Sequence, residues 1–320
     1  MKYKLQIQRD EIGEATRARF AMLIPILTGM LLSTKRNIIE QAGGYEDISL
    51  EMFTRVYVEH PGDHGICFEY AVHECIRNRD PAIHPTISSV LEDFCGIKGG
   101  AESILFGIEK HGPASVLETA KNALTEDSRV LVGKVGKPAK LKPHLDNLVR
   151  AHNSRTHLER LPSSIRGLWK ADLFVGNPDR ERWVGTTLKT NRRDIEKAPG
   201  LRVALYPEER NKEGPKKEET LVYCPLPYSS EFMQLFLATF NIVKQIVATK
   251  GKQPSRIALI YDDDQHVAKW LVDRAHFPLQ GILAALEPIK QPQFLQEEVV
   301  ESGATGDIIA TAPIPLRVSR

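Results

Sequence analysis

Apolar residues in the first sixty positions recur at the intervals of a helix. They stand at Phe20, Leu23, Ile24, Leu27 and Leu31. This spacing gathers them on one helical face, so residues 1–60 are predicted to form a mainly helical module. The same periodicity predicts a helix over residues 66–77, with Glu69 within its first turn.

The central part of the chain changes to the alternating pattern of strands. Residues 168–176 and 182–190 are rich in β-branched and aromatic residues, and the turn residues Asn177, Pro178 and Asp179 lie between them. These two runs predict a hairpin. Further strands are predicted at residues 201–206, 220–224 and 256–261, with helices over residues 230–249 and 266–274.

Prolines punctuate residues 80–160, a stretch of mixed pattern with helical segments near 101–109 and 115–124. We interpret this stretch as an insertion. The succession of helices and strands predicts an α/β protein in which helices flank a mixed β-sheet core. Its predicted parts are a helical module at residues 1–60, an α/β core at 61–275 that carries the insertion, and a C-terminal tail at 276–320.

Length and composition are those of a globular protein, since 320 residues with 42% hydrophobic and 26% charged content can bury a full core. The most apolar stretch, residues 21–32, is shorter than the roughly 20 residues of a membrane span, and Pro25 interrupts it. The four cysteines lack the spacing of paired zinc ligands, so we expect reduced thiols. A cytoplasmic protein without a membrane span is predicted.

Positive charge is concentrated in one part of the chain. The formal net charge is only +2, yet residues 129–193 contain 15 Lys and Arg against 5 Asp and Glu. Such a block fits a polyanion-binding surface, because each phosphate contact releases counterions, although a solvated surface is the alternative. The candidate nucleic-acid contacts are Lys134, Lys137, Lys140, Lys142, Arg192 and Arg193.

The predicted hairpin brings three polar side chains to one face. If its register is centred on the loop, Gly176 pairs with Trp183, and Asp172 then stands opposite Thr187. Lys189 lies two residues beyond Thr187 and shares its face. An isolated Asp and Lys on a sheet can also be a structural ion pair, so this juxtaposition alone leaves both interpretations open.

A larger pattern surrounds these residues: GICFE at 65–69 opens a helix, KADLFV fills 170–175, and VGTTLKTN fills 184–191. It resembles the PD-(D/E)xK nuclease superfamily, in which a helix glutamate, a strand aspartate and an acid-x-lysine on the next strand bind metal and cleave nucleic acid. The resemblance implies a restriction-endonuclease-like core with Glu69, Asp172 and Lys189 as catalytic residues.

The sequence departs from that pattern at Thr187, where the family has Glu or Asp. A threonine hydroxyl is a weak, neutral ligand for Mg²⁺, which prefers anionic oxygens. The resemblance implies Mg²⁺ or Mn²⁺ held by Glu69, Asp172 and the main-chain carbonyl of Leu188. Thr187, Leu188 and His73, four residues after Glu69, are candidate supporting residues.

The implied activity is metal-dependent endonucleolytic hydrolysis of phosphodiester bonds, with DNA as the expected substrate. A bound metal would neutralise developing charge and lower the pKa of the attacking water, while Lys189 would orient that water or stabilise the transition state. Restriction or anti-phage defence in a prokaryotic cell is the implied setting, with other subunits of a defence complex or a second copy of the chain as candidate partners.

Two alternatives remain open from the sequence. Thr187 is also compatible with a catalytically inactive, nuclease-like module that binds nucleic acid or serves in assembly. Separately, the carboxylates at residues 262–264 could form a second metal site, although an acidic helix start explains them more simply. Trp169 and Trp183 could stack on bases or pack in the core.

Overall fold

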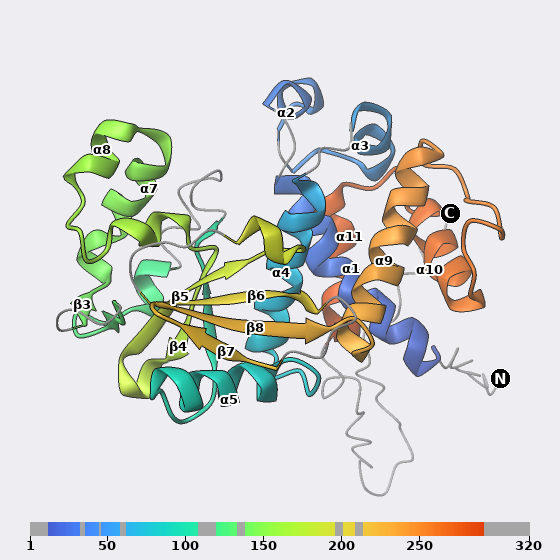
Figure 1. The fold of residues 1–320 in the computed structure, drawn as a ribbon. Coiled ribbons are helices and arrows are strands. Elements are labelled where there is room, and N and C mark those ends of the chain that lie inside the picture. The colour runs from blue at the N-terminus through green and yellow to red at the C-terminus, as the bar shows by residue number, and fades with distance from the viewer. Residues whose placement is uncertain are drawn as a thin grey trace, which may run out of the picture. The chain divides into compact units, whose positions relative to one another are not determined.

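The computed structural model describes eight segments of the chain (Figure 1). They are residues 12–32, 36–44, 46–57, 62–107, 120–132, 138–195, 201–208 and 214–290. Their contacts group them into two compact units. Unit 1 takes its described residues from 1–27, 35–58 and 238–320, and unit 2 from 28–34 and 59–237. The helices that follow residue 237 therefore group with the N-terminal helices.

Unit 2 contains a mixed sheet, which confirms the predicted α/β class with a mixed sheet and helices. Its described strands follow the order β1-β4-β5-β6-β8-β7, and off this path β2 pairs with β5 and β3 pairs with β2. The sheet runs antiparallel from β1 through β4 to β5, and parallel from β5 through β6 to β8. The strand bounds are β1 Glu102–Leu105, β2 Arg129–Val130, β3 Ala139–Lys140, β4 Leu173–Asn177, β5 Arg182–Leu188, β6 Arg202–Glu208, β7 Lys216–Glu218 and β8 Leu221–Pro227.

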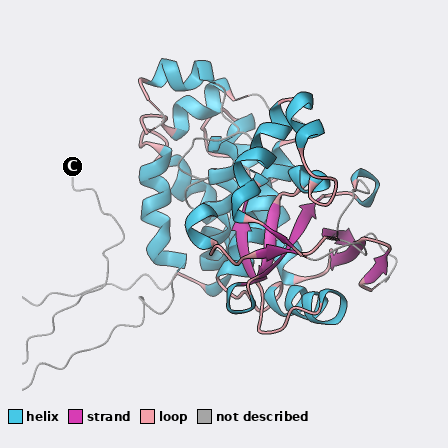
Figure 2. Cartoon of the chain, turned by 90° about the vertical axis from the view of Figure 1, so that its left-hand side faces the viewer, coloured by secondary structure: helices cyan, strands magenta, loops and turns pink. Residues whose placement is uncertain are grey.

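Helices of unit 2 contact this sheet. Figure 2 shows the described helices in cyan and the strands in magenta. Helix α4 (Asp63–Arg77) contacts β1 and β5, and α5 (His84–Cys95) contacts β8. The predicted apolar side of α4 is confirmed, since Phe68 and Val72 are fully buried. The helix α4 begins at Asp63 and not at Ile66. The prediction that Glu69 lies in the first turn is therefore wrong, and Glu69 lies in the second turn.

A smaller helical group follows β3 within unit 2. It comprises the short helices η2 (Lys142–His144), α7 (Leu145–Asn153), α8 (Arg155–Arg160) and η3 (Arg166–Lys170). Their apolar side chains form a cluster with Phe106, Phe174 and Trp183. Trp183 is therefore a packing residue with 2% of its surface exposed, and base stacking by this side chain is ruled out by burial.

Unit 1 is helical in its described residues. It includes α2 (Arg36–Ala42), α3 (Leu50–Val56), α10 (Asp262–Val272) and α11 (Leu279–Lys290), with residues 14–27 of α1 (Glu14–Leu32) and residues 238–248 of α9 (Glu231–Ala248). None of the described helices combines the length and apolar character that crossing a membrane requires.

Three element predictions need correction. The predicted helical segment at 101–109 contains strand β1, because four residues are too few for periodicity to decide and pairing with β4 decides instead. The predicted strand at 256–261 is a loop with Ile257 exposed, because β-branched residues alone provide no partner strand. Residues 166–170 form η3, so β4 starts at Leu173 and not at Leu168.

The predicted hairpin register is confirmed. Gly176 pairs with Trp183, and Leu173 pairs with Thr186. Gly176 leaves no room for a side chain, because an added Cβ would lie 2.1 Å from the carbonyl oxygen of Arg182 and 2.8 Å from Cα of Trp183. The close approach of β4 and β5 therefore requires glycine at this position.

Gly176→Ala should destabilise the protein by about 3 kcal/mol, because backbone atoms and not a flexible side chain must move to accept the methyl group. Urea unfolding followed by circular dichroism measures the change. Gly65→Ala is a matched control, since an added Cβ there meets nothing within 4 Å and alanine favours a helix. Equal stability of the two variants would contradict the steric argument.

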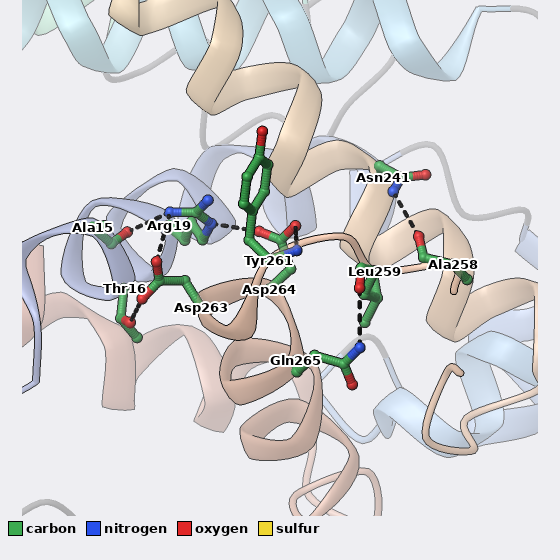
Figure 3. A network of polar contacts seen from close by, with 10 residues as sticks. All are labelled: Ala15, Thr16, Arg19, Asn241, Ala258, Leu259, Tyr261, Asp263, Asp264 and Gln265. Carbon is green, nitrogen blue, oxygen red and sulfur yellow. Dashed lines mark hydrogen bonds and ion pairs between the residues drawn. The ribbon is translucent and has the colours of Figure 1, made fainter. Parts of the chain in front are cut away.

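The acidic start of α10 belongs to an ion-pair network in unit 1 (Figure 3). Arg19 Nε donates to Asp264 Oδ1 at 2.6 Å, and Asp264 Oδ2 accepts the Tyr261 N–H at 3.4 Å. Thr16 donates to Asp263, and Arg256 pairs with Asp262. These contacts support the helix-start interpretation of residues 262–264.

Arg19→Met should lower the free energy of unfolding by about 3 kcal/mol, because it leaves the buried carboxylate of Asp264 without its cation. Arg55→Met removes an exposed pair with Glu51 and should cost less than about 0.5 kcal/mol. Thermal unfolding of both variants tests the difference, and a stable Arg19→Met protein would show that Asp264 does not depend on Arg19.

Candidate functional site

Asp172 lies where three backbone segments of unit 2 meet. It directly precedes β4, and its N–H donates to the carbonyl of Thr186 on β5 at 2.8 Å. Its own carbonyl accepts the N–H groups of Phe106 and Gly107, at 2.9 and 2.6 Å, from the segment after β1. These bonds fix the backbone from which the Asp172 side chain projects.

The side chain of Asp172 faces the end of β5. Its Oδ2 accepts the Leu188 N–H at 2.8 Å and lies 3.8 Å from Nζ of Lys189. The Asp172 side chain is 9% exposed and that of Lys189 is 34% exposed, so the pair stands at the border between core and solvent. Asp172 and Lys189 are brought together, as their places in the hairpin predict.

Glu69 reaches the same place from α4, and Gly107 makes this approach possible. A methyl group added to Gly107 would lie 2.7 Å from Oε2 of Glu69 and 3.4 Å from Cα of Asp172. The Glu69 carboxylate and Asp172 therefore border one small space that only glycine leaves open. Glu69 comes from the second turn of α4, a helix that contacts β1 and β5.

Thr187 is hydrogen-bonded to Arg202, a residue that the sequence analysis does not single out. Its hydroxyl accepts a hydrogen bond of 2.8 Å from Nη1 of Arg202, and Nη2 of Arg202 donates to the carbonyl of Gly167. Arg202 opens β6, opposite Gly185 of the parallel strand β5. The supporting residue Thr187 is thus joined to a buried cation at the position where the nuclease pattern has an acid.

Arg202 is 1% exposed, and this burial lowers the pKa of its guanidinium to about 10, while the Asp172 carboxylate acts in the opposite direction. Because that value lies well above neutral pH, Arg202 stays charged. The pKa of Lys170 is also lowered, first by its partial burial and then by the positive charges of Arg202 and Lys189. Arg202, Lys170 and Lys189 therefore affect one another electrostatically, and the carboxylate of Asp172 interacts with Arg202 and Lys189.

His73 connects α4 to the sheet. Its Nδ1 lies 2.9 Å from the hydroxyl of Ser103 on β1. This bond connects α4, the helix that carries Glu69, to β1. His73 thus contributes to the position of Glu69.

A divalent ion fits the oxygen donors of this place. Glu69 and Asp172 supply carboxylates from two different elements, which is the ligand chemistry that Mg²⁺ prefers. The Leu188 N–H is bonded to Asp172, and the carbonyl of Leu188 remains the predicted third ligand. Within the described residues no group of three or more His, Cys, Asp and Glu side chains could hold a metal ion, so water and substrate oxygens would complete the coordination.

The predicted nucleic-acid contacts are spread over unit 2. Arg192 and Arg193 follow Lys189 in η5 (Arg192–Asp194), and the Arg192 guanidinium lies 5.5 Å from the Tyr223 ring centre. Lys140 and Lys142 pair with Asp127 and Glu126 at 3.7 and 3.1 Å. Lys134 and Lys137 lie outside the described residues.

Trp169 precedes Lys170 in η3 and is more exposed than Trp183. It is partly buried, its ring lies 5.9 Å from that of His152, and Lys170 Nζ lies 5.3 Å from its centre. The aromatic face is thus already in contact with side chains of its own unit.

Comparison with known proteins gives no relative: no family model, no curated protein and no solved structure matches the chain.

Gly107→Ala should weaken Mn²⁺ binding about tenfold, because the new methyl group displaces the Glu69 carboxylate from the space beside Asp172. Isothermal titration with Mn²⁺ measures this. Stability should change little, since the flexible end of a side chain can move away. Gly214→Ala is the control, because an added Cβ there meets nothing within 4 Å, and it should bind Mn²⁺ as wild type does.

Proposed function

We propose that this protein is a metal-dependent nuclease of the PD-(D/E)xK type, with a restriction-endonuclease-like core in unit 2. The observation that supports this best is the convergence of Glu69, Asp172 and Lys189 from α4, the start of β4 and the end of β5. This is the distribution over a helix and two successive strands that the sequence resemblance implies for the catalytic residues.

The proposed reaction is attack of water on the phosphorus of a phosphodiester, with cleavage of the bond to the leaving oxygen. Glu69 and Asp172 would hold Mg²⁺ or Mn²⁺, which supplies charge neutralisation and an acidified water when bound. The hydrogen bond from the Leu188 N–H to Oδ2 fixes the orientation of the Asp172 carboxylate. The other oxygen, Oδ1, would then be the one that binds the metal. The ammonium group of Lys189, 3.8 Å from Asp172, can donate a hydrogen bond to the water or to the phosphate oxygens.

The proposed substrate is DNA. Arg192 and Arg193 lie three and four residues after Lys189, and Lys140 and Lys142 belong to the same unit. These positive side chains would bind backbone phosphates without reading bases. In line with the resemblance, we place this activity in the cytoplasm of a prokaryotic cell, in restriction or defence against phage, as a homo-oligomer or within a larger complex.

Asp172→Asn and Lys189→Ala should each reduce cleavage of plasmid DNA at least about 10³-fold, because one removes a metal-binding charge and the other a transition-state donor. The assay compares supercoiled, linear duplex and single-stranded DNA with Mg²⁺, Mn²⁺ or chelator. Lys252→Ala, an exposed change in unit 1, should cleave as wild type does. Cleavage by Asp172→Asn at the wild-type rate would disprove this active centre.

A second function is favoured by one contact. The hydrogen bond from Arg202 to Thr187 fills the place of the missing acid with a cation, which suits a module that binds nucleic acid without cutting it. Such a protein would bind DNA equally well in chelator and would leave every substrate intact. The same set of assays therefore separates the two functions.

A further inference from the structure

Arg202 is a buried cation with more hydrogen-bonding capacity than its surroundings use. Two of its nitrogens donate to Thr187 and to the Gly167 carbonyl, while Nε is buried without a hydrogen-bond partner in the described part of the chain. Its place depends on the strand beside it. Arg202 pairs with Gly185 of β5, where an added Cβ would be in ordinary contact with Cγ of Arg202 at 3.9 Å and would collide with Leu168 at 2.7 Å.

The charges around Arg202 do not cancel. The carboxylate of Asp172 interacts with it, but that carboxylate also faces Lys189 at 3.8 Å and the Leu188 N–H. Lys170 adds a third positive charge, and Glu69 is the second negative one. Among these five described side chains the three cations outnumber the two carboxylates, so this group carries one positive charge in excess before any ligand enters.

An excess positive charge near the core has opposite effects on the two expected ligands. It repels a divalent cation and attracts an anion, and partial burial makes both effects stronger than in water. A phosphate group reverses the sign of the site and thereby improves the binding of a cation. Linkage then requires that the cation improves phosphate binding by the same factor.

We propose that Arg202 is a positioning residue that gives this centre affinity for phosphate without divalent metal and holds its affinity for the free metal low. Metal then binds well only together with a phosphate. The inference rests on the proposed function, because it takes Glu69 and Asp172 as metal ligands and a phosphate ester as substrate. It adds an order: phosphate enters first.

Two binding experiments test the proposal without any cleavage. Mn²⁺ is titrated into phosphate-free protein and followed by electron paramagnetic resonance, and inorganic phosphate is titrated in chelator and followed by calorimetry. Arg202→Gln removes the charge but keeps a side-chain amide that can donate to Thr187 or Gly167. It should tighten Mn²⁺ binding and weaken phosphate binding, each by about tenfold.

Arg202→Lys retains the charge and should stay within about threefold of wild type for both ligands. Arg256→Gln, in an exposed ion pair of unit 1, is the matched control and should match wild type. If Arg202 had only a structural role, Arg202→Gln would weaken both ligands together, and this result would overturn the proposal. An unchanged affinity for both ligands would do the same.

The two proposals fail separately. Opposite shifts of Mn²⁺ and phosphate affinity in a protein that cuts no DNA would support the role of Arg202 and contradict the nuclease. DNA cleavage by a wild-type protein that binds no phosphate in chelator would support the nuclease and overturn the phosphate-first order. If Arg202→Gln does not fold, Mn²⁺ titration of wild type with and without phosphate decides, because the proposal requires at least about tenfold tighter Mn²⁺ binding with phosphate.

Discussion

The hydrogen bonds of Asp172 connect the candidate site to the sheet. One residue bonds through its N–H to β5, through its carbonyl to the segment after β1, and through its carboxylate to the Leu188 N–H. A buried carboxylate with such a bond loses it when the side chain rotates, so the orientation is set by folding and not by the ligand. Preorganised groups of this kind stabilise developing charge most effectively. The geometry of the candidate site and that of the sheet therefore depend on the same hydrogen bonds.

Electrostatics gives the second constraint. Burying a guanidinium is unfavourable unless opposite charge and hydrogen bonds compensate it. Arg202 obtains two hydrogen bonds and shares Asp172 with Lys189, so its compensation is incomplete. A site with such a balance is unlike a simple carboxylate cluster that attracts metal by itself. In the proposed role of Arg202, an incoming anion completes this compensation, so that the binding of a phosphate depends on a residue of the core.

The sequence could predict the hairpin because its information is local. The four-residue loop 178–181 between Asn177 and Arg182 is consistent with the pairing of Gly176 with Trp183, and this register carries Asp172 to the end of β5 beside Lys189. Glu69 could be proposed from the resemblance alone, and its place beside Asp172 depends on Gly107, far from both in sequence. In the sequence, Gly107 is marked only as a glycine that follows a strand. The pattern of residues 101–109 predicts a helical segment, so even that strand, β1, is not visible from the sequence.

Arg202 could not be found from the sequence for a related reason. Arg202 is the first residue of β6, which follows β5 after a long connection and pairs with it in parallel. No feature of the neighbouring sequence indicates that an arginine at this position is buried. The loop at 256–261 illustrates the opposite failure, since Ile257 and Ile260 have strand propensity but are 95% and 78% exposed. Propensity described these residues correctly in isolation, and long-range pairing decided their structure.

Gly185 lies where η3, β5 and β6 come together. A Cβ at this position would lie 2.7 Å from Cδ2 of Leu168 in η3 and in ordinary contact with Arg202 in β6. Arg202 in turn donates through Nη1 to the hydroxyl of Thr187, two residues along β5 from Gly185. A side chain at position 185 would therefore disturb first the packing of η3 on the sheet, while the bond between Arg202 and Thr187 depends on the pairing of β6 with β5.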